Sequence, residues 1–303
     1  APRGTKLVYR VRPVRPVRPV LASRSPWYEA CVSGAASAAG AASPGQSGPV
    51  QSRPVWADPG RSYPLTARGR SVYARAMPHA SVSAVSRDEA LRLAREFATA
   101  RHADTPPCHD FSHVERVLAL AERLAAEEGA DLFVVRMAAL LHDIGRGLEP
   151  RIGPDPDRHE ELSVELARPF LEAIGLEPAL TERVLRAVLE HRHRRGREPS
   201  SPEAACLYDA DKLDSLGAVG VARAYLWLGE HGRSVHYPPE SWAGVDPSNN
   251  ATEHDSLQRE WEIKLSGLKD RLYTASGRAI AAERHERMRR FLDELELEAR
   301  GEA

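Results

Sequence analysis

Hydrophobic and polar positions follow a helical period through most of the chain after residue 85. The stretch SRDE at 86–89 has the form of a capping box, in which the Ser side chain accepts a hydrogen bond from the fourth residue, and it opens the amphipathic run ALRLAREFATARH. The same reasoning predicts further helices from Asp110 or Ser112 to Gly129, from Asp131 to near Gly145, and at about 160–175, 179–194, 202–215, 217–230, 254–273 and 276–298.

No part of this body has the pattern of β-structure. Alternating β-branched runs are absent, and so are the G-x-G-x-x-G, P-loop and G-x-S-x-G sequences of common nucleotide and serine-nucleophile sites. Only residues 231–253, HGRSVHYPPESWAGVDPSNNATE, interrupt the helical period, and so long a loop in a compact domain is often functional. We therefore expect one all-α domain of several helices over residues 86–303.

The first 85 residues have a different composition. The stretch VRPVRPVRPV at 11–20 excludes helix because Pro removes backbone donors, and residues 1–76 carry 12 Lys or Arg against Glu29 and Asp58. We expect residues 1–85 to be a disordered, low-complexity basic segment. Three explanations stay open: a transit peptide, a nucleic-acid-binding tail, or translation that starts upstream of the natural start. Met77, the first Met of the chain, lies where the composition changes, which favours the third.

The composition of the body limits the partners that it can have. Residues 77–303 hold 30 basic and 41 acidic residues, so no long nucleic acid is expected to bind there. The three Cys residues are far apart and odd in number, which indicates a reducing compartment without disulfides. No apolar run approaches the ~18–20 residues of a membrane span, and no secretory signal is seen. We expect a cytoplasmic protein without membrane contact, and the sequence leaves its oligomeric state open, a homo-oligomer included.

Two histidines extend the apolar stripes of consecutive predicted helices. His113 precedes Val117 and Ala121 on one stripe, and Val135 leads to His142 on the next. Because the connection between these helices is short, they should pack antiparallel, with the start of one beside the end of the other. A single histidine on such a face is usually an ordinary core residue. Two that meet beside a carboxylate favour a metal site.

Carboxylates stand in the right places to complete such a site. Asp143 follows His142, and both can reach one ion only where the helix ends, an ending that Gly145 is expected to supply. Asp211 lies in the acidic segment YDADKLDSLGAVGVARAY at 208–225, for which a solvated face is the alternative interpretation. Two imidazoles and two carboxylates suit a divalent ion of intermediate softness.

The order His113, His142-Asp143, Asp211 resembles the HD superfamily of metal-dependent phosphohydrolases, named after that dipeptide. The segments HDFSHVERV, MAALLHDIGR, DADKLDSLGAVGVAR and KLSGLKDRLYTASGRAIAAERHERMRRFL are together similar to small stand-alone bacterial HD hydrolases, some of which are nucleoside triphosphate pyrophosphohydrolases. The resemblance covers about residues 88–298. It implies a compact multi-helix HD-domain bundle with His113, His142, Asp143 and Asp211 as metal ligands.

Two further histidines lie between the HD pair and the last Asp. Some branches of the superfamily use such residues to hold a second metal or a substrate phosphate, so His159 and His191 are candidates for either role, phosphate contact being favoured. The alternative is that His159 merely begins a helix and His191 merely ends one. His109 is expected to precede its helix and to be structural.

Phosphoester or phosphoanhydride hydrolysis also needs cations that neutralise the phosphate oxygens. Lys212, next to Asp211, is the best candidate for a catalytic cation, and Arg146, Arg223 and Lys264 are weaker candidates for phosphate contact. Asp143 has a second oxygen that is suited to orient or deprotonate the attacking water, so we expect it to be catalytic as well as a ligand.

The function that the resemblance implies is hydrolysis of a phosphate bond in a small nucleotide, with nucleoside triphosphate pyrophosphohydrolase as one form. It depends on one divalent ion (Mn, Mg, Co, Ni or Fe), or on two. The alternatives are a nucleotide phosphomonoesterase, a phosphodiesterase, or a non-catalytic metal-containing regulatory module that binds a ligand. The substrate, the bond cleaved and the identity of the metal are not determined by the sequence.

Overall fold

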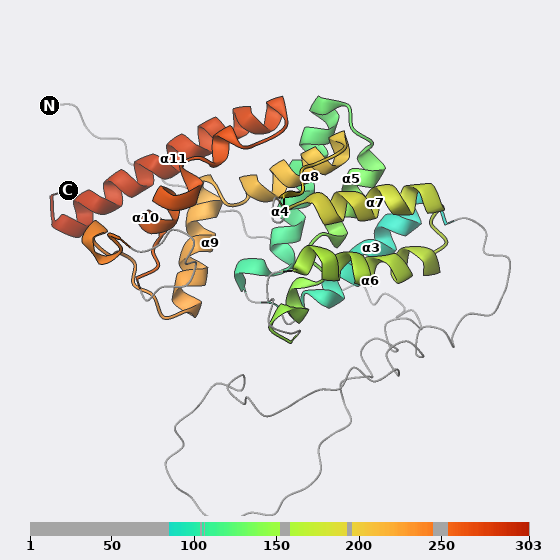
Figure 1. Ribbon diagram of the computed structural model, residues 1–303, viewed down its shortest axis with the longest axis horizontal. Helices are drawn as coiled ribbons and strands as arrows, with labels where there is room; N and C mark the ends of the chain where they lie inside the picture. Colours follow the sequence, from blue (N-terminus) through green and yellow to red (C-terminus); the bar gives the residue numbers. More distant parts are fainter. Residues whose placement is uncertain are drawn as a thin grey trace, which may run out of the picture. The chain divides into compact units, whose positions relative to one another are not determined.

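The computed structural model describes residues 85–103, 105, 107–151, 158–192, 196–244 and 254–302. Over these ranges the chain contains nine α-helices and no β-strand, which confirms the predicted all-α class (Figure 1). The helices are α3 (Arg87–Arg101), α4 (Phe111–Glu128), α5 (Leu132–Leu141), α6 (His159–Ala173), α7 (Pro178–Glu190), α8 (Pro202–Leu213), α9 (Gly217–Glu230), α10 (Leu257–Glu260) and α11 (Ala275–Arg300). The expected disordered segment lies outside the described residues except for Val85, as do residues 245–253 of the expected loop.

Polar caps at predicted positions begin the first helices. The Ser86 side chain accepts a hydrogen bond from the backbone N–H three residues on, at 3.3 Å, which confirms Ser86 as the cap, whereas the Glu89 carboxylate pairs with Arg92. Asp110 caps α4 by accepting from the backbone N–H of Ser112 at 3.0 Å, and Asp131 caps α5 in the same way. Between these two helices Gly129 adopts a left-handed φ of 71°. This tight connection lets α4 and α5 pack against each other as expected.

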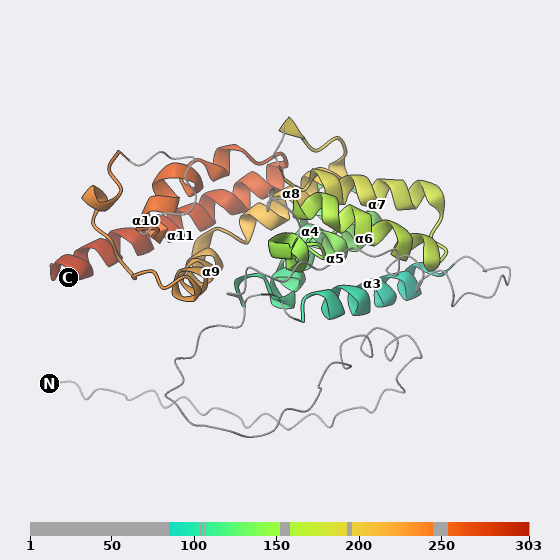
Figure 2. The same ribbon diagram turned by 60° about the horizontal axis from the view of Figure 1, so that its bottom comes forward.

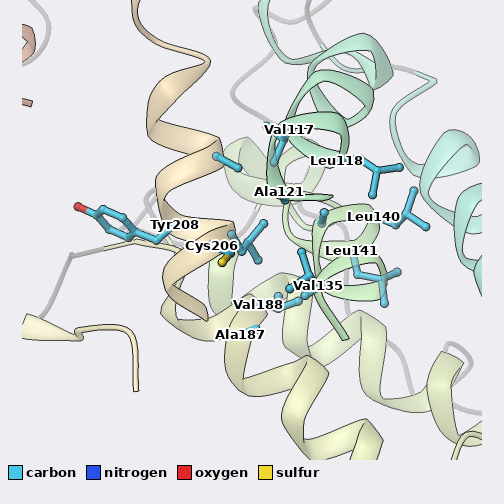
Figure 3. Packing of buried hydrophobic residues seen from close by; sticks show 14 of the residues in the cluster. Val117, Leu118, Ala121, Val135, Leu140, Leu141, Ala187, Val188, Cys206 and Tyr208 are labelled. Carbon is cyan, nitrogen blue, oxygen red and sulfur yellow. The ribbon is translucent and has the colours of Figure 1, made fainter. Parts of the chain in front are cut away.

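Helix α5 forms the centre of the core. It packs against α3, α4, α7 and α8, and all of its residues except Leu132 and Arg136 are buried. A short helix that is apolar almost all round is typical of such a position. Figure 3 shows side chains of α5 lying among those of α4, α7 and α8; labelled there are Val117, Leu118, Ala121, Val135, Leu140, Leu141, Ala187, Val188, Cys206 and Tyr208. In the described part of the chain, no helix combines the length and the apolar character needed to cross a membrane.

Helix α11 joins the C-terminal helices to the core. It lies along α9 and also contacts α8 and α4 (Figures 1 and 2). The buried carboxylate of Asp209, on α8, fixes its start by accepting hydrogen bonds from the backbone N–H of Tyr273 (3.0 Å) and of Thr274 (2.7 Å), and from the Thr274 hydroxyl (2.6 Å). Because Thr274 also caps α11, this network sets where the helix begins relative to α8.

Two predicted helices differ from those observed. The helix expected over 254–273 is instead the single turn α10, a π-helical turn at Trp261–Leu265 and a 3₁₀ turn at Leu268–Asp270. Successive short turns still bury its four leucines, Leu257, Leu265, Leu268 and Leu272, so these positions reach the core without one regular helix. The third predicted helix, α5, ends at Leu141 and not near Gly145, so residues 142–145 form a turn.

Gly145 serves a different purpose from the expected helix stop. A β-carbon on this residue would lie 2.6 Å from the backbone N of Ser163 and 2.7 Å from the backbone O of His159. The backbone N–H of Gly145 also donates to the Ser163 hydroxyl at 3.0 Å. The missing side chain therefore allows the turn after α5 to approach the start of α6, where His159 lies.

Gly145→Ala is expected to lower the free energy of unfolding by about 1–3 kcal/mol, because the added methyl group would overlap backbone atoms of α6. Denaturant unfolding monitored by circular dichroism measures this change. Gly147→Ala is the matched control, since a β-carbon there meets its nearest side-chain atom, Cγ2 of Thr105, at 3.7 Å. Equal stability of the two variants would contradict a close-packing role for Gly145.

Candidate metal centre and cavity

Three histidines present their Nε2 atoms to the buried carboxylate of Asp143, and for two of them local hydrogen bonds explain the orientation. His142 and His191 are the residues that follow α5 and α7, and each Nδ1–H donates to a backbone carbonyl three residues earlier, at 2.8 Å (Ala139) and 2.6 Å (Val188). These bonds leave the Nε2 lone pair as the free one. The Nε2 atom of His142 lies 3.4 Å from that of His113, in the first turn of α4, so the two predicted histidines do meet.

The Asp143 carboxylate lies between two pairs of imidazoles. Its Oδ2 lies 3.6 Å from Nε2 of His113 and 3.7 Å from Nε2 of His142. Its Oδ1 lies 3.3 Å from Nε2 of His159 and 3.7 Å from Nε2 of His191. All five residues are buried, and Oδ1 of Asp143 has no hydrogen-bond partner among the described residues. The turn after α5 therefore places one carboxylate at the junction of four helix ends.

Asp211, the remaining predicted ligand, lies beside His113 and so belongs to the group that His113 and His142 form with Asp143. Its Oδ1 lies 3.4 Å from Nε2 of His113, and its Oδ2 accepts a hydrogen bond from Nζ of Lys212 at 2.6 Å. Lys212 also donates to the backbone carbonyl of His191 at 3.3 Å. Although neighbouring helical side chains diverge, the length of Lys212 lets its ammonium group return to the carboxylate beside it. The structure thus brings together all four residues expected to bind the first metal, with His159 and His191 next to them.

The donor set fits divalent metal ions. The candidate ligand atoms form two groups, His113 with His142 and Asp143, and Asp143 with His159 and His191, each within 4.8 Å. Two ligands at about 2.0–2.2 Å from a common ion are separated by roughly 3–3.5 Å, and the observed separations are close to that. The unpaired Oδ1 of Asp143, buried between two imidazoles, is the clearest sign that a cation is required there.

Electrostatics within the cluster favour an ionised Asp143 and neutral rings at His142 and His159. Burial lowers the pKa of His142 to about 4, and burial and the nearby Arg146 guanidinium hold that of His159 well below its usual value. Burial opposes ionisation of Asp143, but Arg146 and the neighbouring imidazoles outweigh it and hold its pKa well below the ordinary value. His113 differs, because burial lowers its pKa but the hydrogen bonds that it donates to three carboxylates raise it to about 9. Its charge partly compensates those carboxylates.

The four candidate cations lie in different positions. Lys212 is next to both ligand groups, as described. Nε of Arg146 donates to Oδ2 of Asp143 at 2.9 Å, which places its guanidinium at the centre. Arg223 donates to the backbone carbonyl of Cys108 at 3.1 Å and is held by a buried carboxylate, so it stabilises the wall of the site. The Lys264 side chain is 57% exposed and pairs with Glu260, so it lies at the rim.

A cavity of about 1030 Å³ opens from this centre. Its lining includes His113 and Asp211, all four candidate cations, and residues of α9, α10 and the turns before α11. His109 and Arg192 also line it. His109 precedes α4 as expected, and its ring lies 6.2 Å from that of His113 in the cavity lining. The sequence pattern does not predict that either side chain faces the cavity. Both residues lie just outside a regular helix, where the helical period no longer determines the direction of a side chain.

Comparison with known proteins agrees with this geometry. The family model of the HD domain matches residues 110–216, the segment that carries all four residues expected to bind the first metal. Over 197 residues the chain is 33% identical to the uncharacterized protein YpgQ of Bacillus subtilis (strain 168), which spans 64% of this chain and 85% of YpgQ. This chain belongs to the HD-domain family. The resemblance seen in the sequence is thereby confirmed.

Solved structures of the HD family have the same fold. The structure of Bacillus subtilis YpgQ in complex with ADP is similar to this chain with a TM-score of 0.53 and 28% identity, covering 71% of this chain and 97% of that one. An HD-superfamily hydrolase from Bacillus thuringiensis is similar with a TM-score of 0.54 and 26% identity, covering 71% of this chain and 99% of that one.

Proposed function

We propose that this HD-family chain is a divalent-metal-dependent hydrolase that cleaves a phosphoester or phosphoanhydride bond in a small nucleotide. The observation that carries the proposal is the Asp143 carboxylate, whose two oxygens each face a pair of imidazole Nε2 atoms at the end of a large cavity. Within this class we favour a nucleoside triphosphate pyrophosphohydrolase, as the resemblance implies.

The residues of the centre are suited to two ions. His113, His142, Asp143 and Asp211 would hold the first, and Asp143, His159 and His191 the second. Divalent ions bound there would lower the pKa of a water molecule and polarise a phosphoryl oxygen. The convergence of His159 and His191 on Oδ1 of Asp143 favours a second ion over the direct phosphate contact that the sequence favoured.

The protein itself would orient the phosphate and neutralise its charge. Lys212 lies between the ligand Asp211 and the backbone of His191, so its ammonium group can donate to a phosphate oxygen that reaches the centre. Arg146, which contacts Asp143 and lines the cavity, is a second donor to such a phosphate. We propose that Asp143 bridges the two ligand groups and does not deprotonate water, because both its oxygens face imidazole nitrogens.

A nucleotide fits the cavity in size and chemistry. Its volume of about 1030 Å³ is at the upper end of the range for small-molecule sites. Basic residues lie near the centre, and aromatic and apolar residues such as Tyr208, Trp227 and Leu272 form the wall. YpgQ, a relative that this chain matches over most of its length, has been solved with ADP, which supports a nucleotide ligand for this chain as well.

Incubation of the full chain with a panel of ribo- and deoxyribonucleotides, each with Mn²⁺, Mg²⁺, Co²⁺ or Ni²⁺, tests the proposal. A pyrophosphohydrolase releases pyrophosphate and a monophosphate from a triphosphate, and a chelator should abolish this turnover. Release of inorganic phosphate from monophosphates would indicate a phosphomonoesterase, and cleavage of diesters a phosphodiesterase. If nucleotides bind but none is cleaved with any of the four metals, the chain is a ligand-binding regulatory module instead.

A further inference from the structure

The buried carboxylate of Asp214 holds the first candidate ligand in place. It follows α8 directly, three residues after Asp211, and is 1% exposed. Its Oδ2 accepts a hydrogen bond from Nδ1–H of His113 at 2.7 Å, the ring nitrogen opposite the one that faces the metal centre. Because a carboxylate can only accept at this short distance, Nδ1 keeps a proton, and an ion can bind the ring only at Nε2, where it replaces the second proton of the charged form.

Two arginines fix the Asp214 carboxylate in turn. Arg116, one turn after His113 on α4, donates through Nε to Oδ1 at 2.8 Å and through a terminal nitrogen to Oδ2 at 3.0 Å. Arg223, on α9, lies 2.9 Å from Oδ2 and also donates to the backbone carbonyl of Cys108. The carboxylate is thus held from α4 and α9 together, so it cannot rotate away from His113 without breaking a bidentate pair.

The surroundings of Asp214 favour the ionised form of its carboxyl group. Its burial alone would raise its pKa, but the hydrogen bonds from His113 and Arg116 outweigh burial and lower the pKa to about 2. A carboxylate behind a metal-binding imidazole orients the ring and makes its free nitrogen a stronger ligand. Among the four histidines of the centre, His142 and His191 have a backbone carbonyl in this position, and only His113 has a carboxylate among the contacts that the described residues make.

We propose that Asp214 is a positioning residue that orients His113 and strengthens its bond to the first ion, with Arg116 and Arg223 holding the carboxylate in register. This inference rests on the proposed metal centre. It makes the affinity for the first ion depend on a network that reaches α9 in the cavity wall, and it gives Arg223 a role in the centre without direct contact with a phosphate.

The test is Mn²⁺ binding by the full chain, measured by electron paramagnetic resonance of free Mn²⁺ without any nucleotide. Asp214→Asn should weaken binding of the tighter ion by about 10- to 100-fold, and excess Mn²⁺ should restore most of the turnover. The matched control is Asp209→Asn, which removes the charge of an equally buried carboxylate of α8 that contacts Tyr273 and Thr274. It should lower thermal stability and leave the Mn²⁺ affinity unchanged.

Unchanged Mn²⁺ affinity in Asp214→Asn, or the same loss in both variants, would overturn the positioning role. If Asp214→Asn does not fold, Arg116→Ala is the variant that tests the inference. The Arg116 side chain is partly exposed, so its loss should be tolerated, and it leaves one side of the Asp214 carboxylate without a partner. A several-fold weaker affinity is then expected, and wild-type affinity would refute the inference. Failure of the proposed function can be told apart from failure of this inference, since it would show as absent turnover in a wild-type chain that binds Mn²⁺ normally.

Discussion

Asp143→Asn is expected to abolish nucleotide turnover, with a fall in kcat of about 10³-fold or more, and to remove high-affinity binding of both ions. The amide keeps the size of the side chain but loses its charge and one of the two oxygens that face the imidazole pairs. Loss of several kcal/mol of transition-state stabilisation corresponds to rate factors of this size. Calorimetric titration with Mn²⁺, together with the rate on the best nucleotide, measures both effects.

Variants of the second ligand pair separate the two candidate roles of these histidines. His159→Ala or His191→Ala should reduce the Mn²⁺ stoichiometry from two to one if this pair holds an ion with Oδ1 of Asp143. Two ions bound in either variant, with only the KM for nucleotide raised, would instead show phosphate contact. A stoichiometry of one in the wild-type chain would contradict the bridging role of Asp143.

The meeting of His113 and His142 could be predicted from the sequence because it depends on local rules. Each residue continues an apolar stripe whose direction the helical period determines, and a short connection makes consecutive helices antiparallel neighbours. Once Asp131 and Gly129 are recognised as a cap and a stop, the start of α4 must lie beside the end of α5. The positions of His159 and His191 along the helices are equally regular, but periodicity does not show which distant helix ends converge.

The contacts that shape the centre could not be predicted from the sequence, since they join residues far apart in the chain. Asp214 lies 101 residues from His113, and nothing in an acidic segment distinguishes the carboxylate that faces a metal from the one behind its ligand. Gly145 resembled a helix stop, although its function is the close approach of α6. The helical period also predicted one helix where α10 and two other turns lie. Short turns of different kinds can bury leucines at the same spacing as a regular helix does.

Lys212 contributes a charge that the two carboxylates of the centre cannot supply. Its ammonium group is bound to Asp211 and to the backbone carbonyl of His191, so it bridges residues from both ligand groups. The Lys212 side chain is 21% exposed and lines the cavity, where a phosphate can reach it without displacing a ligand. A cation fixed in this way can stabilise charge on a phosphate in the transition state without moving.

Lys212→Ala should therefore lower kcat by about 10²- to 10³-fold, the effect of removing one preorganised donor, while both Mn²⁺ ions still bind. Steady-state kinetics at saturating Mn²⁺, with the stoichiometry measured on the same sample, checks both parts. Lys264→Ala is the matched control, since that lysine lines the same cavity but is 57% exposed and pairs with Glu260, so its kcat should change less than about threefold. Equal losses of kcat in the two variants would indicate a general electrostatic effect of the cavity. Loss of a Mn²⁺ ion in Lys212→Ala would indicate that Lys212 only holds Asp211 in place and does not act on the phosphate.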